Sequence, residues 1–215
     1  MVATKVVTIC TPKGGVGKST IAANLAVKFS QSNYKTIIFD LDPQQTLFKW
    51  SATRRNVHTD VPKIECVTSE LSLWGTDLSR SGNYDIVIFD LPPGLIKEML
   101  EVKTLCKKSD IVLVPTGSTP YDLDSAGPWI KALSDINVSV SSILNRVNPR
   151  ETYFKAAQIA LNNLSDLCPI VVRQLTDAYQ YAIDGLTASD KPKCRSYPDF
   201  DGVYRYVCRK IGIRA

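Results

Sequence analysis

Short apolar runs alternate with amphipathic stretches along this chain. Ile21, Leu25 and Phe29 recur every four residues and so place one apolar stripe on a predicted helix. The apolar runs are short and rich in β-branched residues, which is typical of buried strands. The alternation predicts an α/β fold with three layers, in which helices cover both faces of a mostly parallel twisted sheet. The predicted strands are 6–10, 35–40, 63–67, 84–90, 111–115, 138–144 and 170–172.

The composition is that of an ordinary globular protein. A chain of 215 residues is long enough for a sizeable core, and we expect a single domain over 1–215. It has no run of eighteen or more apolar residues, and its start lacks the apolar core of a signal peptide, so we expect a cytoplasmic protein. The helices predicted after the first cover 45–55, 69–80, 121–133, 151–164 and 201–211.

The six cysteines are widely spaced and contain no C-x-x-C pair. This spacing argues against a metal knuckle and against a disulfide scaffold, so we expect reduced and mostly buried thiols. His58 is the only histidine. It has no cysteine or acidic cluster beside it, so we expect it at the surface and assign no transition metal.

The glycine-rich segment 11–20 (TPKGGVGKST) lies between the first predicted strand and the first predicted helix. A strand, a glycine loop and a helix in this order direct several backbone N–H groups at one point, where an anion is favoured. We expect Lys18 to reach the β- and γ-phosphates of a nucleotide and the Ser19 hydroxyl to bind Mg²⁺. The motif is a variant P-loop, because Pro12 replaces its first glycine and Lys13 adds a cation. The predicted cradle consists of Lys13, Gly14, Gly15, Val16, Gly17, Lys18, Ser19 and Thr20.

Carboxylates stand at the ends of two predicted strands. Asp40 and Asp42 close the strand at 35–40, and Asp90 closes the strand at 84–90. The carboxyl ends of parallel strands face the crevice in which open α/β sheets bind ligands. We expect Asp90 to bind Mg²⁺ from the Walker B position. Asp40 and Asp42 are expected to hold the metal through water and to position the attacking water.

Four segments resemble the ParA/MinD family of ATPases. Segment 13–20 (KGGVGKST) is similar to the family's deviant Walker A signature, and segment 40–45 (DLDPQQ) resembles its D-x-D-P-Q element. The pair at 145–146 is similar to an N-R pair that lies near the base. Residues 179–187 resemble a Y-x-x-A-x-x-x-G-x-[ST] segment. The resemblance covers nearly the whole chain and looks closest to the short ParA partition ATPases.

The resemblance gives roles to particular residues. It implies that Lys13 crosses a dimer interface to the partner's nucleotide, and that Lys13, Lys18 and Asp42 are catalytic. Asp42 would orient the nucleophile, while Asp40 supports the water shell of the metal. The sequence around Asn145 does not decide between a base contact and a turn cap, because a carboxamide suits either role. The resemblance favours the base and adds Arg146.

The implied activity is hydrolysis of MgATP to ADP and phosphate by a P-loop NTPase fold. ATP would build a homodimer that binds nucleoid DNA without sequence preference, and a centromere-bound ParB-like partner would trigger hydrolysis and release. This cycle would segregate a plasmid or a chromosome. The alternative in the same family is the positioning of another cargo, such as a protein microcompartment, or a division inhibitor at a membrane. An iron–sulfur reductase is not favoured, because Cys106 and Cys168 lack glycine-flanked contexts.

Positive charge is concentrated near the C-terminus. Residues 191–215 hold seven basic and two acidic residues, an excess equal to the net charge of +5 for the whole chain. A basic segment on a neutral body favours a polyanion such as DNA or an acidic membrane, and a solvated helix face is the alternative. We expect the closing helix to pack on the protein body, and we do not expect a membrane partner. The predicted DNA contacts are Lys191, Lys193, Arg195, Arg205 and Arg209.

Overall fold

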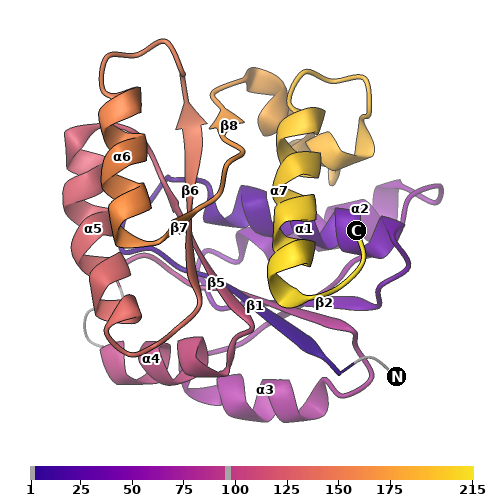
Figure 1. Cartoon of the computed structure of the whole chain (residues 1–215). Helices are drawn as coiled ribbons and strands as arrows, with labels where there is room; N and C mark the ends of the chain where they lie inside the picture. Colours follow the sequence, from indigo (N-terminus) through magenta and orange to yellow (C-terminus); the bar gives the residue numbers. More distant parts are fainter. Residues whose placement is uncertain (1–2, 95–97) are drawn as a thin grey trace.

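The computed structural model describes residues 3–94 and 98–215. Within these residues, eight strands form a sheet whose neighbouring strands all run parallel. The strand order is β3-β2-β4-β1-β5-β6-β7, and β8 pairs with β6 (Figure 1). β3, which corresponds to the strand predicted at 63–67, lies at one edge. The strands are β1 (Lys5–Ile9), β2 (Thr36–Asp40), β3 (Glu65–Thr68), β4 (Ile86–Asp90), β5 (Ile111–Thr116), β6 (Val140–Val147), β7 (Asp166–Leu167) and β8 (Val172–Arg173).

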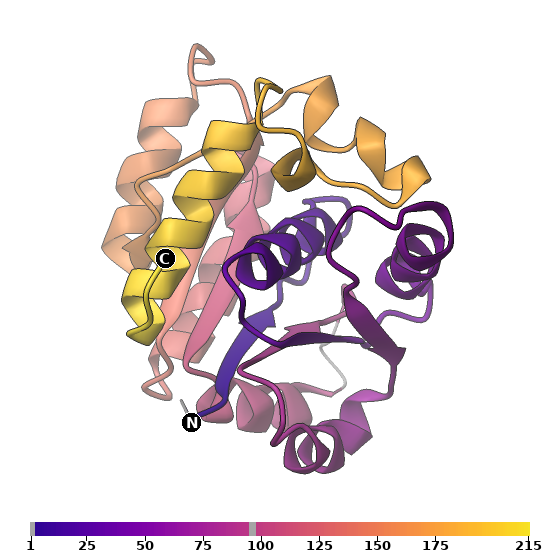
Figure 2. The same cartoon turned by 90° about the vertical axis from the view of Figure 1, so that its right-hand side faces the viewer.

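Helices cover both faces of the sheet (Figures 1 and 2). Side chains alternate along each strand, so Val7 and Ile9 of β1 join one core while Val6 and Cys10 join the other. The first core lies under α1, α2 and α7, and the second under α4, α5 and α6. The predicted three-layer α/β/α arrangement is therefore correct. The helices are α1 (Lys18–Gln31), α2 (Thr46–Val57), α3 (Trp74–Arg80), α4 (Met99–Lys108), α5 (Pro120–Ser134), α6 (Phe154–Leu164) and α7 (Tyr197–Ile211).

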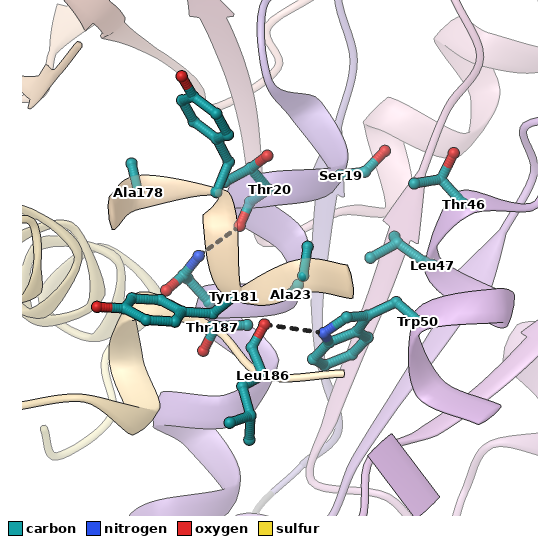
Figure 3. Close-up of a pocket in the computed structure, with 13 residues that line it drawn as sticks. Ser19, Thr20, Ala23, Thr46, Leu47, Trp50, Ala178, Tyr181, Leu186 and Thr187 are labelled. Atoms are coloured by element: carbon teal, nitrogen blue, oxygen red, sulfur yellow. Dashed lines mark hydrogen bonds between the residues drawn. The ribbon is translucent and has the colours of Figure 1, made fainter. Parts of the chain in front are cut away.

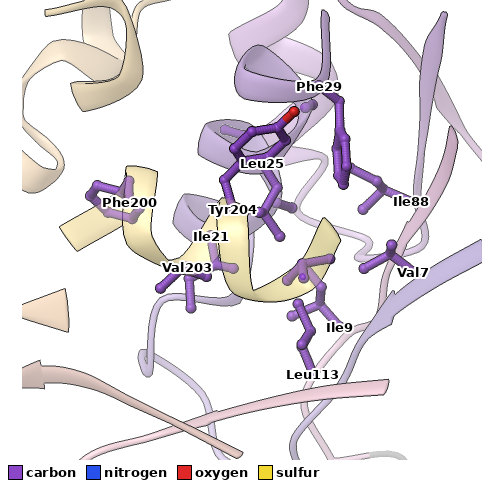
Figure 4. Close-up of a cluster of buried hydrophobic side chains, with 14 of the residues drawn as sticks. Val7, Ile9, Ile21, Leu25, Phe29, Ile88, Leu113, Phe200, Val203 and Tyr204 are labelled. Carbon is purple, nitrogen blue, oxygen red and sulfur yellow. The ribbon is translucent and has the colours of Figure 1, made fainter. Parts of the chain in front are cut away.

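The apolar stripe of α1 packs where its spacing predicts. Ile21, Leu25 and Phe29 are all buried against β1 and α7 (Figure 4). The rings of Phe29 and Tyr204 meet edge to face with centroids 5.2 Å apart. Because α1 begins at the end of the glycine loop, this packing fixes the loop's position over the sheet.

Several boundaries differ from the prediction. α7 begins at Tyr197 and not at residue 201, since Pro198 fits the first turn of a helix. Asp199 and Asp201 lie inside α7, where Asp199 pairs with Arg173 and Asp201 with Lys28.

Other elements were mispredicted or absent from the prediction. β6 runs to Val147, so Asn145 and Arg146 lie within a strand and not beyond it. α4 was not predicted, and the helix expected at 69–80 divides into a short 3₁₀ turn and α3. The segment before α7 contains three further 3₁₀ turns: η2 (Thr176–Ala178), η3 (Gln180–Asp184) and η4 (Ala188–Asp190).

The cysteines lie as predicted. All six cysteines are free thiols, and only Cys194 is not fully buried. His58, expected at the surface, is half-buried at the end of α2, where its Nε2 lies 2.7 Å from the Asp184 carbonyl oxygen. Of the helices in the described ranges, none combines the length and the apolar character needed to cross a membrane.

Candidate nucleotide site

The glycine loop connects β1 to α1 at the carboxyl end of the sheet. Gly15 and Gly17 adopt positive φ angles of 75° and 86°, which lie in the left-handed region that favours glycine. A cavity of about 200 Å³ opens over the loop. Its lining residues are Gly14, Gly15, Gly17, Lys18, Ser19, Thr20, Asp42 and Pro93. Of the predicted cradle, all but Lys13 and Val16 therefore face one space.

Lys18 is the buried cation of this cavity. Burial lowers the pKa of Lys18 below its usual value, although the charges of Asp90 and Asp42 raise it. Its Nζ donates a hydrogen bond of 3.4 Å to the Lys13 carbonyl. A buried ammonium between carboxylates and backbone N–H groups is suited to a polyphosphate, whose charge it stabilises.

Ser19 and Asp90 meet directly beneath the loop. The Ser19 hydroxyl donates a hydrogen bond of 2.7 Å to Asp90 Oδ2. Asp90 is buried at the end of β4, and in the described chain its Oδ1 has no hydrogen-bond partner. Burial raises the pKa of Asp90 to about 7, against the opposing effect of the Ser19 hydrogen bond. An unsatisfied carboxylate oxygen beside a serine hydroxyl is a donor set that fits Mg²⁺.

Asp40 has a structural role that the sequence did not reveal. Its Oδ2 accepts hydrogen bonds from the backbone N–H groups of Leu47 and Phe48, at 2.9 and 3.0 Å, in the first turn of α2. Burial raises its pKa, and these hydrogen bonds oppose that effect. Asp40 pairs in register with Asp90 across β2 and β4. It therefore joins the predicted metal site to the start of α2.

Asp42 lies in the connection between β2 and α2 and is half-buried. Its Oδ1 accepts a hydrogen bond of 2.9 Å from the Gln44 backbone N–H. Its side chain lines the cavity over the glycine loop together with Lys18 and Ser19. The structure thus brings Asp42 to the predicted phosphate position.

A second cavity, of about 110 Å³, lies on the other side of the loop. Asn145 Nδ2 donates to the Val16 carbonyl at 2.5 Å, and Arg146 donates to the Gly15 carbonyl at 2.7 Å. Both residues line this cavity, as do Gly17 and Thr20 of the loop. We call it the base pocket, after the base contact that the family resemblance implies for Asn145 and Arg146. Its other lining residues are Val172, Arg173, Gln174, Leu175, Ala178, Tyr179 and Phe200.

Tyr179 and Phe200 are the aromatic residues of the base pocket, and neither was predicted as a site residue. The guanidinium of Arg146 lies 5.9 Å from the centre of the Tyr179 ring. Tyr179 is the first residue of the family segment at 179–187, whereas no sequence pattern marks Phe200. Flat side chains of this kind can stack on a base.

Lys13 does not line the phosphate cavity. Its Nζ lies 2.6 Å from Asp122 Oδ1 at the start of α5. Asp122 also forms a capping box with Thr119. The sequence predicted a helix at 121–133, but not that Lys13 would reach its first turn.

The five predicted DNA contacts are all exposed, in two groups. Lys191, Lys193 and Arg195 lie in the turn before α7. Arg205 and Arg209 lie four residues apart on the outer face of α7, and Arg205 Nε donates to Asp201 at 2.7 Å.

Residues 7–176 match the family described as the CobQ/CobB/MinD/ParA nucleotide binding domain. The chain belongs to this family. ParA/MinD proteins are P-loop ATPases. The predicted resemblance, the P-loop ATPase class and the ligands ATP and Mg²⁺ are therefore confirmed at the level of the family.

Individual relatives are distant in sequence. The chain is 29% identical over 147 residues to the maintenance of carboxysome distribution protein A of Gloeobacter kilaueensis, covering 68% of this chain and 65% of that protein. It is similar to the septum site-determining protein MinD of Pyrococcus horikoshii complexed with Mg-ADP (TM-score 0.78, 19% identity, 99% of each chain). It is also similar to a plasmid partition protein of Borrelia burgdorferi bound to AMPPNP (TM-score 0.72, 17% identity, 96% and 99% covered). These structures confirm the fold.

Proposed function

We propose that this protein is a switch that hydrolyses ATP to ADP and phosphate, dimerises on ATP and binds DNA without sequence preference. The proposal assigns it to the partition of a plasmid or a chromosome. The observation that carries the ATPase step is the contact between Ser19 and Asp90. It leaves one buried carboxylate oxygen unsatisfied beneath a loop whose cavity is lined by Lys18.

The residues of the site have distinct tasks in this proposal. Ser19 and Asp90 would hold Mg²⁺, Asp40, in register with Asp90, would support the water shell of the metal, and Lys18 would bind the β- and γ-phosphates. When bound, the cation neutralises charge that develops on the phosphates. Asp42 orients the attacking water at the phosphate cavity. Catalysis in this proposal depends on positioning and electrostatics, so the contribution of each group is determined by its position relative to the phosphates.

Lys13 completes the site only in a dimer. In one protomer its ammonium pairs with Asp122, away from the phosphate cavity. In the proposed ATP dimer it leaves Asp122 and contacts the nucleotide of the partner. ATP binding and dimerisation would then depend on each other.

The exposed basic residues around α7 are the proposed DNA contacts. Each lysine or arginine that neutralises a phosphate releases counterions, so binding of this kind weakens steeply as salt rises. The proposal includes a centromere-binding ParB-like partner that triggers hydrolysis and release, and it places the protein on the nucleoid.

A double charge reversal tests the DNA contacts. Lys193→Glu with Arg195→Glu should abolish binding to random-sequence duplex DNA, while the affinity for MgATP stays unchanged. The matched control is Lys107→Glu with Lys108→Glu at the end of α4, a second exposed basic pair. Unchanged DNA affinity in the first variant would place the DNA site elsewhere.

A second candidate function is the positioning of a protein microcompartment. The relative from Gloeobacter kilaueensis, named for maintenance of carboxysome distribution, supports it. Both functions use the same ATP switch, and they differ in the cargo partner. Crosslinking of the ATP-bound protein in its own cells separates them: a DNA-bound partner supports partition, and a shell-associated partner supports the alternative.

A further inference from the structure

The segment 178–190, here called the strap, has no task in the mechanism above. It leaves the base pocket at Ala178 and Tyr179 and ends at Asp190 in η4. Between these points it packs against the side of α2 (Figure 3). The strap contains the whole of the family segment at 179–187. It therefore joins the wall of the base pocket to the helix that follows Asp42.

A buried ion pair ties the strap to α2. The guanidinium of Arg54 donates to both carboxylate oxygens of Asp190, at 2.9 and 2.8 Å. The side chains of Arg54 and Asp190 are 1% and 2% exposed. Nε and Nη1 of Arg54 also donate to the carbonyls of Pro62 and Gly185, at 2.7 and 3.2 Å. A buried arginine whose three nitrogens all donate hydrogen bonds holds its neighbours in one arrangement, because breaking the ion pair leaves a charge buried alone.

Three further contacts fix the strap at the same place. The Trp50 indole N–H donates to the Leu186 carbonyl at 3.2 Å (Figure 3). Gly185 has φ +72°, and a Cβ there would lie 2.3 Å from the backbone nitrogen of Arg54. Asp190 is oriented by the backbone N–H and hydroxyl of Thr187, at 2.8 and 3.0 Å. The glycine and the threonine of the family segment thus serve the junction with α2.

The strap is also anchored to α1. Asn24 Oδ1 accepts hydrogen bonds from the backbone N–H and the hydroxyl of Ser189, at 3.0 and 2.9 Å. α1 carries Ser19 and Thr20 in its first turn. The strap therefore contacts the phosphate helix, the base pocket and α2 at once.

α2 is not packed closely against the strap and α1 along its whole length. A partly open apolar pocket of about 70 Å³ lies between the strap, α1 and α2 (Figure 3). Its walls include Ala23, Leu47, Trp50 and Leu186. Side chains do not meet across this pocket, so the ion pair and the hydrogen bonds described above carry the connection between α2 and the strap there.

We propose that Arg54 is a positioning residue for hydrolysis. Through its ion pair with Asp190, Arg54 makes α2 move together with the strap. An adenine bound in the base pocket contacts the strap and thereby fixes the position of Asp42, just before α2. The path is short, because α2 begins four residues after Asp42 and its first turn binds Asp40. The inference rests on the role proposed above for Asp42.

The test compares Arg54→Met with the control Lys28→Met. Lys28 also forms a largely buried ion pair, with Asp201, but it joins α1 to α7 away from the strap. Steady-state ATP hydrolysis is measured without DNA or partner, and hydrogen exchange of α2 is measured with and without MgADP. Arg54→Met should lower kcat at least roughly tenfold with KM within about twofold, as expected for a displaced catalytic group. Arg54→Lys should recover part of kcat, and Lys28→Met should lower Tm but leave kcat within about twofold.

Hydrogen exchange separates coupling from general loss of stability. In the wild type, MgADP should slow exchange in both the glycine loop and residues 46–57, whereas in Arg54→Met only the loop should be protected. If Arg54→Met does not fold, Asp190→Asn removes the charge and keeps the size of the side chain, and the same outcomes apply. The inference is overturned if Arg54→Met leaves kcat unchanged, or if Lys28→Met lowers kcat as much as Arg54→Met does. It is also overturned if MgADP does not slow hydrogen exchange of α2 in the wild type. A protein that failed to bind DNA would refute the partition function without affecting these results.

Discussion

Lys13 of the glycine loop forms an ion pair with Asp122 at the start of α5, with Nζ and Oδ1 2.6 Å apart. Burial raises the pKa of Asp122, but the hydrogen bonds from Lys13 and Thr119 outweigh it and hold the pKa below its usual value. Lys13 is thus occupied within its own chain, although its proposed target is the nucleotide of a second protomer. The proposed dimer therefore requires this pair to break.

Removing the competing charge should favour the dimer. Asp122→Asn keeps an acceptor oxygen for the cap of α5 and removes the ion pair, which at this exposure contributes up to about 1 kcal/mol. We expect ATP-dependent dimerisation to strengthen a few-fold and Lys13→Ala to abolish it, as measured by light scattering. Asp110→Asn, which breaks the pair with Lys5 at the opposite end of the sheet, is the control. Dimerisation of Lys13→Ala at the wild-type level would reject the role of Lys13.

Asp90 should account for the metal dependence of nucleotide binding. Asp90→Asn removes the carboxylate that faces Ser19, so Mg²⁺ should no longer tighten binding of ADP. Titration calorimetry with Mg²⁺ and with a chelator measures this difference. Asp77→Asn is the matched control, because Asp77 also accepts a hydrogen bond from a serine, Ser69, at 2.6 Å outside the site. Persistent Mg²⁺ dependence in Asp90→Asn would show that another residue holds the metal.

The contact between the glycine loop and β6 should be intolerant of a methyl group. A Cβ at Gly17 would lie 2.3 Å from Asn145 Nδ2, and φ is +86° there. Gly17→Ala should therefore weaken ATP binding at least roughly tenfold and cost about 1–2 kcal/mol of stability. Gly212→Ala shares the positive φ, at +72°, but in the described chain its Cβ has no atom within 4 Å. If both variants bound ATP equally, the base pocket would not depend on this contact.

The pair that joins α1 to α7 should make stability depend on pH. Burial raises the pKa of Asp201, but hydrogen bonds from Lys28 and Arg205 hold it below its usual value. A carboxylate with a lowered pKa stabilises the fold above its unfolded value, about 3.9, and this contribution is lost as pH falls through the folded value. Asp201→Asn should cost about 1 kcal/mol at pH 7, and the cost should vanish toward about pH 2 to 3. Urea unfolding of the wild type and of Asp201→Asn at both pH values measures this cost. An equal difference in the free energy of unfolding at the two pH values would contradict the role given to the Asp201 carboxylate.

The sequence predicted the parts of the fold that local patterns govern. The stripe of Ile21, Leu25 and Phe29 predicted α1 because every fourth residue lies on one helix face. Asp40 and Asp90 were placed correctly because parallel strands bring their carboxyl ends to one edge. The glycine loop was recognisable because its conformation requires glycines at fixed positions.

Long-range contacts could not be predicted in this way. Asp199 and Asp201 of α7 pair with Arg173 and Lys28, which come from other segments of the chain. The same holds for Asp122 with Lys13 and for Arg54 with Asp190, since no local pattern pairs residues more than a hundred positions apart. The missed start of α7 has a local cause, because Pro198 was not recognised as a first-turn residue.

Binding to random-sequence duplex DNA, measured with ATP, with ADP and without nucleotide at two salt concentrations, tests the central claim most directly. The account predicts binding only with ATP, and weaker binding at the higher salt, because the contacts are to phosphates. Absence of binding in all three states would contradict it, since the basic residues around α7 would then serve another partner.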